Sequence, residues 1–169
     1  TDSFGSIVSY GLEPGIPNMC ALRILCDVLE ERGVTDYPVH IKLDTGMHRL
    51  GFITEEMDEL IDFLSTSDRV KVKSLYSHLA ASDDPQHDEF TLGQIDMYRK
   101  HSSMIDAVLD YKPIHHVLNS AGIERFSEHQ MDMVRLGIGI YGISAVDMNN
   151  VKPAASLTCK ILQIKELTP

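Results

Sequence analysis

A lysine interrupts an otherwise apolar run that is predicted to form a strand. In residues 39–43, His40 and Lys42 share one face of the strand and the aliphatic side chains share the other. An isolated buried ammonium group is costly, so Lys42 must be paired, neutralised or modified. Two readings stay open. Lys42 forms an ion pair with Asp44 or another nearby carboxylate, or it is a perturbed lysine of a functional site.

An arginine interrupts a second apolar run, at residues 133–141. Gly137 and Gly139 follow Arg135 at alternate positions, a pattern typical of a strand that a neighbouring backbone or a ligand approaches closely. A buried guanidinium does not shed its proton, so Arg135 needs hydrogen-bond acceptors. These acceptors come either from an internal salt bridge or from a ligand that carries a ring nitrogen or a phosphate.

Two further predicted strands end in residues that can bind an anion. His78 ends one of them, where a single histidine is more often a hydrogen-bonding residue than a catalyst. Small residues in the run 116–122 let backbone amides approach a phosphate, although an ordinary turn has the same composition. Together, four strand ends bring to one mouth the residues Lys42, Arg49, His78, His116, Asn119, Ser120 and Arg135. This donor-rich cluster suits a small phosphorylated ligand.

The elements that would position these residues alternate along the chain. Strands are predicted at residues 6–10, 39–43, 70–78, 113–119 and 133–141, helices at 17–32, 54–66 and 91–109, and an edge or linking strand at 154–167. Gly33 is expected to end the first helix and Thr54 to cap the second. Such alternation predicts an α/β fold with parallel strands, which carries its site at the carboxyl ends of the strands. The pattern fits either a small open sheet or a partial (β/α) barrel of the TIM type.

Composition places the chain among ordinary globular proteins. Its 169 residues suffice for one domain, with 43% hydrophobic and 24% charged residues. The net charge of −10 argues against a nucleic-acid partner, and the absence of a long apolar run argues against a membrane span. The start has no signal-peptide pattern and no initiator methionine, which suggests that the natural start lies elsewhere. Cys20, Cys26 and Cys159 form neither a disulfide framework nor a metal site, so we expect a cytoplasmic protein without metal.

Four motifs, in this order, resemble the signature of the alanine racemase family. They are HIKLDTGMHRLG at residues 40–51, SHLA at 77–80, HVLNSAG at 116–122 and VRLGIGIYG at 134–142. Phe90 and Thr91 match the family as well, and the resemblance covers essentially the whole chain. Four ordered motifs of this length are highly specific.

The resemblance implies an enzyme of fold type III that uses pyridoxal 5'-phosphate (PLP). Members of this family have an N-terminal α/β barrel and a C-terminal β domain, and they form homodimers with active sites between the subunits. They are isomerases that interconvert L- and D-alanine, and D-alanine biosynthesis serves peptidoglycan and cell-wall synthesis. The resemblance thus implies alanine as the substrate and a second copy of the enzyme as the partner.

The resemblance also implies roles for individual residues at the cofactor. Arg135 looks like the arginine that hydrogen-bonds the PLP ring nitrogen, and His78 looks like the residue that supports this arginine. Ser120, together with the backbone of Gly137 and Ile138, resembles the phosphate cradle. An arginine does not hand its proton to the ring, which should keep the ring a weaker electron sink.

Four more residues receive roles in the same way. Arg49 resembles the arginine near the cofactor hydroxyl and the substrate carboxylate. Lys42 matches the lysine that is often carbamylated in this family, which would turn a buried cation into an anion bridging to Arg49. His116 and Asn119 resemble supporting residues of the PLP pocket.

Both catalytic bases of the family find no match in this sequence. The Schiff-base lysine belongs to a motif like KANAYG on the first barrel strand, and the catalytic tyrosine comes from the C-terminal domain of the partner subunit. We therefore expect part of a barrel, about strands four to eight, over residues 1–150, and a linking segment over 151–169. The isolated chain is expected to be inactive. The alternatives are a related racemase for another amino acid, such as serine, and a non-catalytic PLP-binding module.

Overall fold

Four parallel strands form the centre of the fold in the computed structural model of the chain, which describes residues 2–166. The strands pair in sequence order and are β1 (Gly15–Ile16), β2 (Tyr37–Lys42), β3 (Val70–Tyr76) and β4 (Ile114–His116). Each crossover is helical, through α2 (Met19–Glu31), α3 (Met57–Thr66) and α4 (Asp88–Asp106) in turn. The predicted α/β fold with a parallel sheet is confirmed.

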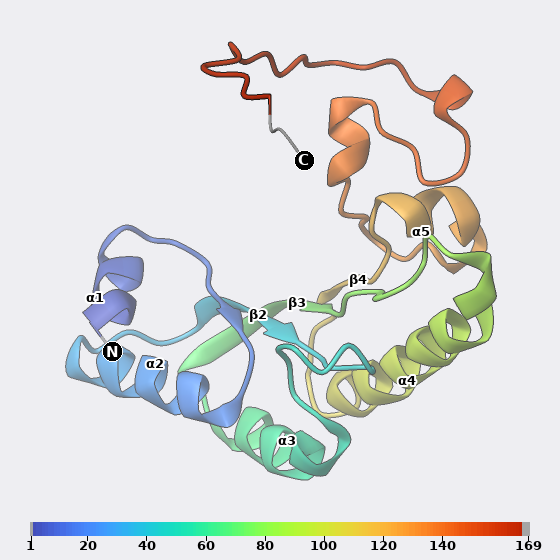
Figure 1. Cartoon of the computed structure of the whole chain (residues 1–169). Coiled ribbons are helices and arrows are strands. Elements are labelled where there is room, and N and C mark those ends of the chain that lie inside the picture. Colours follow the sequence, from blue (N-terminus) through green and yellow to red (C-terminus); the bar gives the residue numbers. More distant parts are fainter. Residues whose placement is uncertain (1, 167–169) are drawn as a thin grey trace.

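The hydrophobic core lies between the sheet and the three crossover helices, which cover one face of the sheet (Figure 1). Val39, Ile41 and Leu75 from the strands are buried there, together with leucines of α2 and α3. In α4, Ile95 and Tyr98 are fully buried, and the Tyr98 hydroxyl donates to the Leu75 carbonyl oxygen at 2.7 Å. The other face of the sheet is therefore the one that is left for polar side chains.

A shift in the pairing of β2 with β3 decides which residues reach that polar face. Val39 pairs with Val72, but the next residue, His40, pairs with Ser74, so one residue of β3 is skipped. A bulge of this kind moves every later side chain to the opposite face of the strand. Ser74 consequently lies on the same face as His40, although strict alternation from Val72 would have placed it with the core.

Two elements at the N-terminal end differ from the sequence prediction. The predicted strand at 6–10 lies almost entirely in helix α1 (Asp2–Ser9), and Phe4 and Val8 from one side of it pack against the core. An apolar run this short has no periodicity that separates a strand from a helix. Strand β1 was missed because it has only two residues, too few to show any alternation.

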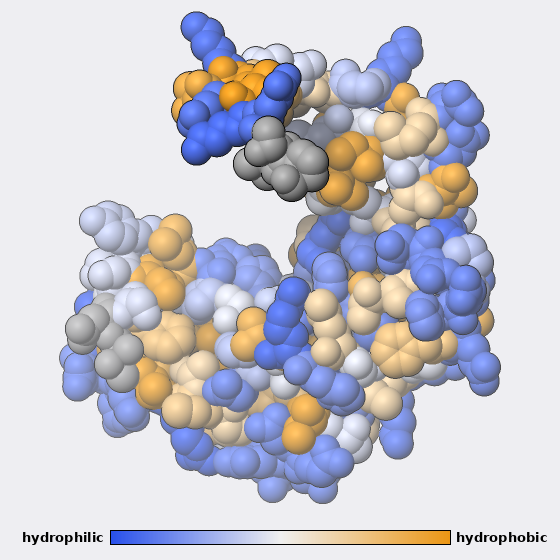
Figure 2. Space-filling view, viewed as in Figure 1, coloured by the Kyte–Doolittle hydropathy of each residue, from blue (hydrophilic) through white to orange (hydrophobic). Residues whose placement is uncertain are grey.

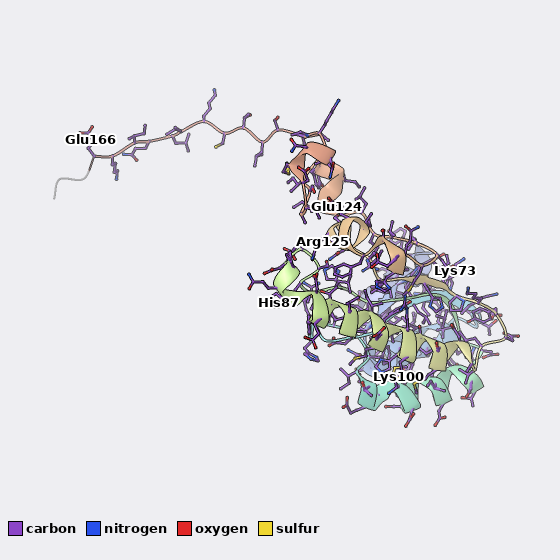
Figure 3. All side chains as sticks on the ribbon, turned by 90° about the vertical axis from the view of Figure 1, so that its right-hand side faces the viewer. Lys73, His87, Lys100, Glu124, Arg125 and Glu166 are labelled. Carbon is purple, nitrogen blue, oxygen red and sulfur yellow. The ribbon has the colours of Figure 1, made fainter. Side chains whose placement is uncertain are left out.

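The C-terminal predictions at 133–141 and 154–167 are also wrong within the described residues. Residues 133–137 are irregular and Ile138–Tyr141 form a 3-10 turn, because the segment makes separate hydrogen bonds to His115, Leu118 and Ser120 and not a continuous strand pairing. The last elements before the tail are the short helix α5 (Ser120–Arg125) and the 3-10 turns Ser127–His129 and Met148–Asn150, besides the 3-10 turn just described. Residues 151–166, which form the tail, have no helix or strand. This tail leads away from the body of the molecule to Glu166 (Figure 3).

The tail exposes apolar side chains, which Figure 2 shows as a hydrophobic patch set apart from the body. Leu157 and Leu162 are almost fully exposed, at 101% and 96%. None of the helices within residues 2–166 has the length and the apolar character to cross a membrane.

Of the two predicted helix boundaries, one is confirmed and one is wrong. Gly33 ends α2 with a φ of 63°, a left-handed conformation that suits glycine. Thr54 is not the cap of the next helix. A 3-10 turn (Thr54–Glu56) precedes α3, the Glu56 carboxylate accepts the Ile53 N–H, and the Thr54 hydroxyl lies 3.2 Å from His101 Nε2.

Candidate functional site

The ring of Tyr76 is the centre of a cluster on the polar face of the sheet. Lys42 and His116 flank it in the strand register, on β2 and β4. The imidazole of His116 stacks on the Tyr76 ring at 5.2 Å, and the Lys42 Nζ lies 5.4 Å from the ring centroid. The Arg135 guanidinium lies over the same ring at 5.5 Å. The fold thus brings three of the predicted site residues together around an aromatic ring, a favourable arrangement for cations.

A glycine on β1 makes room for that tyrosine. A Cβ atom on Gly15 would lie 2.6 Å from the Tyr76 hydroxyl oxygen, closer than any van der Waals contact allows. Burial raises the pKa of Tyr76, and the positive charge of Arg135 opposes this rise. The hydroxyl therefore stays protonated in the neutral range and occupies the space that a side chain at residue 15 would fill.

Arg135 ties together the ends of two strands. Its Nη1 donates to His116 Nδ1 at 2.6 Å and to the His116 carbonyl oxygen at 3.1 Å. Its Nη2 donates to the carbonyl oxygens of Ser77 and Val117. Within residues 2–166, no carboxylate pairs with Arg135, so the internal salt bridge considered for it is not formed. None of these four bonds uses the Nε–H group of Arg135.

Among the described residues, the histidine that hydrogen-bonds Arg135 is His116 and not His78, the residue that the family resemblance implied as its support. Burial and the positive charge of Arg135 lower the pKa of His116 to about 4. The ring is therefore neutral and can accept the N–H of Arg135. A position at the end of a strand predicts which residues lie near one another, but it does not predict which two of them form a hydrogen bond. His78 lies beyond the end of β3, whereas His116 is on β4.

A cavity of about 540 Å³ opens beside Arg135. It is lined by six of the predicted cofactor residues, namely His78, Asn119, Ser120, Arg135, Gly137 and Ile138, among others that include Asp83. The Ser120 Oγ accepts the N–H groups of Gly137 at 2.9 Å and Gly139 at 3.2 Å. This serine hence holds the irregular segment against the start of α5 and shapes one side of the cavity.

The amide of Asn119 is committed to structure. Its oxygen accepts from the Gly122 N–H and the Ser82 hydroxyl, and its nitrogen donates to the Leu79 carbonyl oxygen at 3.1 Å. Asn119 thereby caps α5 and anchors it to the loop after β3. Its place in the cavity wall is that of a scaffold.

Lys42 is buried but has no ion-pair partner among the described residues. Asp44, the candidate partner, instead accepts the backbone N–H groups of Gly46 and His48, both at 3.0 Å. Burial lowers the pKa of Lys42, and the charges of Arg135 and Arg49 lower it further, against the opposing effect of Asp44. The ion pair with Asp44 is thus not formed, and Lys42 is a perturbed amine.

Arg49 and His78 take different positions around the cluster. Arg49 is exposed and lines a separate shallow pocket with His48, Leu50 and Asn18, so it does not share the cavity of Arg135. His78 lines that cavity, and its pKa is lowered by burial and by the positive charges of Arg135, Lys42 and Arg49. The surroundings of the cavity are therefore electropositive within an acidic chain.

Sequence reasoning missed Ser74 and Tyr76. Tyr76 lies two residues and Ser74 four residues before His78, so within the strand predicted at 70–78 this spacing was a signal that the three share a face. Among the described residues, no group of three or more histidine, cysteine or acidic side chains is arranged to hold a metal ion.

The fold and the site together define an α/β domain whose electropositive cavity lies at the carboxyl ends of parallel strands, the usual place for a ligand in such sheets. The family model for the alanine racemase N-terminal domain matches residues 1–145. The chain therefore belongs to the alanine racemase family.

Individual relatives agree with this assignment. The chain is 32% identical over 168 residues to the alanine racemase of Synechocystis sp., covering 97% of this chain and 45% of that protein. The crystal structure of alanine racemase from Corynebacterium glutamicum is similar with a TM-score of 0.75 and 25% identity, over 89% of this chain and 42% of that one. Alanine racemase from Bartonella henselae, whose crystal structure has covalently bound pyridoxal phosphate, shares the fold with a TM-score of 0.70 at 24% identity, over 82% and 38% of the two chains. The chain spans less than half the length of these relatives.

Proposed function

We propose that this chain forms the cofactor-binding part of a PLP-dependent alanine racemase, an isomerase that interconverts L- and D-alanine for peptidoglycan synthesis. The observation that carries the proposal is the cavity lined by both Ser120, at the start of α5, and Arg135, in the irregular segment that follows. Membership of the family supports the reaction, and the Bartonella henselae relative supports the cofactor.

The residues present fit PLP. Its phosphate is an anion and its ring nitrogen is an acceptor, and the cavity offers the Ser120 hydroxyl and a guanidinium whose Nε–H is unused by the described residues. A volume of about 540 Å³ is in the usual range for a small-molecule site. The glycines matter as well, since a Cβ on Gly139 would meet Leu136 at 2.7 Å and Ser120 Oγ at 3.5 Å.

PLP supplies the electron sink for chemistry at the α-carbon of an amino acid. Arg135 donates a hydrogen bond to the ring nitrogen and keeps its own proton, because a guanidinium is too weak an acid to transfer it. The phosphate would be held by the Ser120 hydroxyl and the backbone of Ile138, while the Gly137 N–H, which donates to Ser120 Oγ, would fix the hydroxyl in place. Neutral His116 accepts from Arg135 and fixes the direction in which the guanidinium faces. His78 lines the cavity wall, and Arg49 receives the substrate carboxylate from its exposed position.

Lys42 is proposed to be carbamylated. In this reaction the neutral amine attacks CO2, a nitrogen–carbon bond forms, one C=O π pair moves to oxygen, and the amine releases a proton to solvent. The lowered pKa of Lys42 increases the neutral fraction that can react. The anionic product would lie near Arg135 and Arg49, whose charges already act on this amine. A buried cation without a partner would become a paired anion.

The finer assignments follow from the same proposal. The four described strands and the segment around Arg135 correspond to about strands four to eight of an eight-stranded barrel, within residues 1–150. Residues 151–169 lead toward a C-terminal β domain, and the working enzyme is a cytoplasmic homodimer that acts on alanine. The chain alone does not racemise alanine, because the lysine and the tyrosine expected as catalytic bases find no match in its sequence.

A trapping experiment tests this proposal. The chain is mixed with PLP, treated with borohydride to reduce any bond to a lysine, and measured by intact mass. We expect PLP to bind with one-to-one stoichiometry in a dialysis assay before reduction and to leave no stoichiometric lysine adduct after it. No binding at all would contradict the PLP pocket. A single adduct at Lys42 would contradict its carbamylation and the expectation that this chain carries no Schiff-base lysine.

A further inference from the structure

A line of polar side chains crosses the whole sheet and ends at Arg135. It starts at Glu13, just before β1, whose carboxylate lies 3.1 Å from His40 Nε2. His40 Nδ1 on β2 lies 2.6 Å from the Ser74 hydroxyl on β3, and this hydroxyl lies 3.1 Å from His116 Nε2 on β4. In the last contact, the Arg135 Nη1 lies 2.6 Å from His116 Nδ1. Five groups from five segments thus form one continuous chain of hydrogen bonds.

The arginine end of this chain fixes the direction of its hydrogen bonds. An arginine donates only, so His116 Nδ1 must accept. The neutral ring has a single N–H group, which is therefore on Nε2 and donates to the Ser74 oxygen. Since Ser74 accepts on that side, its own hydrogen is free to go to His40 Nδ1. His40 then carries its proton on Nε2.

The carboxylate end gives the same direction independently. An ionised Glu13 accepts only, so its partner, His40 Nε2, must be the donor. His40 Nδ1 is then the acceptor for Ser74, as the reasoning from Arg135 also requires. No other arrangement of protons with two neutral imidazoles satisfies all four contacts. A chain with a single consistent direction polarises each of its members.

We propose that His40 and Ser74 are positioning residues which, with Glu13 as the terminal acceptor, stabilise the tautomer of His116 that Arg135 requires and thereby the orientation of Arg135. The consequence for the PLP ring nitrogen rests on the proposed function, whereas the coupling between the two histidines does not. Arg135 lacks a carboxylate partner within the described residues, and the chain links it to one at the far edge of the sheet. The opposite tautomer of His116 would direct an N–H at the N–H of Arg135.

Packing alone would not produce this coupling. His40 and His116 do not bond to each other, and only the Ser74 hydroxyl, which is fully buried, connects them. If His40 merely filled space, its loss would leave the proton positions of His116 unchanged. If the line of hydrogen bonds couples the two histidines, the loss of His40 removes the acceptor of the Ser74 hydroxyl. This hydroxyl then turns to His116 Nε2 and favours the other tautomer of His116.

The test is nitrogen NMR of the 169-residue chain with 15N-labelled histidine and no cofactor, where long-range proton–nitrogen correlations report the tautomer of each ring. In the unchanged chain we expect His116 and His40 both as Nε2–H tautomers. In His40→Phe, the Nε2–H signal pattern of His116 should be lost or shifted toward the other tautomer. In Ser74→Ala, the signals of both histidines should change. The matched control Ser102→Ala removes an equally buried hydroxyl that bonds only the Arg99 carbonyl oxygen, and it should change neither.

An unchanged Nε2–H tautomer of His116 in both variants would overturn the proposal. His40 is partly exposed, so His40→Phe decides the question alone if Ser74→Ala does not fold. Because the measurement contains no PLP, a failure of PLP binding would leave its result standing. Conversely, PLP binding to a chain whose histidines are uncoupled would retain the proposed function and remove the positioning roles.

Discussion

Replacement of Ser120 by alanine separates phosphate binding from the rest of the site. The Ser120 oxygen accepts two backbone N–H groups, from Gly137 and Gly139, and its own hydrogen remains available to a phosphate. A hydrogen bond to a charged group is worth about 1.5–3 kcal/mol, and 1.4 kcal/mol is about tenfold in affinity. Ser120→Ala should therefore weaken the binding of a phosphorylated ligand by roughly 10- to 150-fold.

The assay compares two ligands that cannot bond covalently to a lysine. Pyridoxamine 5'-phosphate and pyridoxamine differ only in the phosphate, and their dissociation constants are measured by calorimetry for the chain, for Ser120→Ala and for the control Ser102→Ala. The loss should appear for the phosphorylated ligand alone. Amide hydrogen exchange at Gly137 and Gly139 should also accelerate about 5- to 30-fold, since each loses a bond worth about 1 kcal/mol or more. Equal weakening of both ligands would refute the phosphate cradle and leave Ser120 with a purely structural role.

Three further predictions follow from buried groups and exposed edges. When the unchanged chain is supplied with 13C-bicarbonate, its carbon NMR spectrum should show a carbamate signal. The signal should be lost in Lys42→Arg and kept in the control Lys71→Arg; a signal that persists in Lys42→Arg would come from another amine. The pKa of His116 is about 4 in the folded chain and near 6.5 when unfolded, so the unfolded state binds the extra proton first and stability should fall as pH drops from 6.5 to 4. Urea denaturation should show that the free energy of unfolding falls by on the order of 2 kcal/mol over this pH range, and by less in His116→Gln. An equal fall in both proteins would exclude His116 as its source. The chain should self-associate in sedimentation experiments, because the edges of β1 and β4 are unpaired within the described sheet and the tail is apolar. The variant with Leu157→Lys and Leu162→Lys should associate less, and a monomer at all concentrations would contradict this prediction.

The long elements were predictable because their patterns are local. The apolar spacing of α2 and the alternation in β2 follow from the amino-acid sequence, and parallel pairing follows from their order. The predicted strands at 6–10 and 133–141 failed for a different reason. Phe4 and Val8 pack on α2, and Arg135 is held by carbonyl oxygens of distant segments, so their conformations depend on tertiary contacts that no short window contains.

The site was predictable as a neighbourhood and not as a set of contacts. Lys42, His116 and Arg135 were expected at one mouth, and they do meet there. The ring that they surround, Tyr76, and the hydroxyl that links two histidines, Ser74, were not foreseen, since their face depends on a register shift. His78 was predicted as the partner of Arg135, and His116 is the residue that hydrogen-bonds it. The sequence shows the type of each side chain and predicts the strand end to which it belongs, but not the distance of each histidine from Arg135.

The register shift in β3 lets the strand carry one extra residue and still present the site residues on one face. The skipped residue at the shift lies between Val72 and Ser74 and is Lys73, an exposed lysine with no part in the cluster. Many side chains would serve there, and deleting the position would let Ser74 follow Val72 in regular alternation, so that Ser74 and Tyr76 would keep the polar face and Leu75 the core. A sequence comparison would score such a deletion as a minor gap in a variable position. In the folded chain the pairing of Ser74 with His40 and of Tyr76 with Lys42 would be kept, so residue 73 should tolerate both substitution and loss.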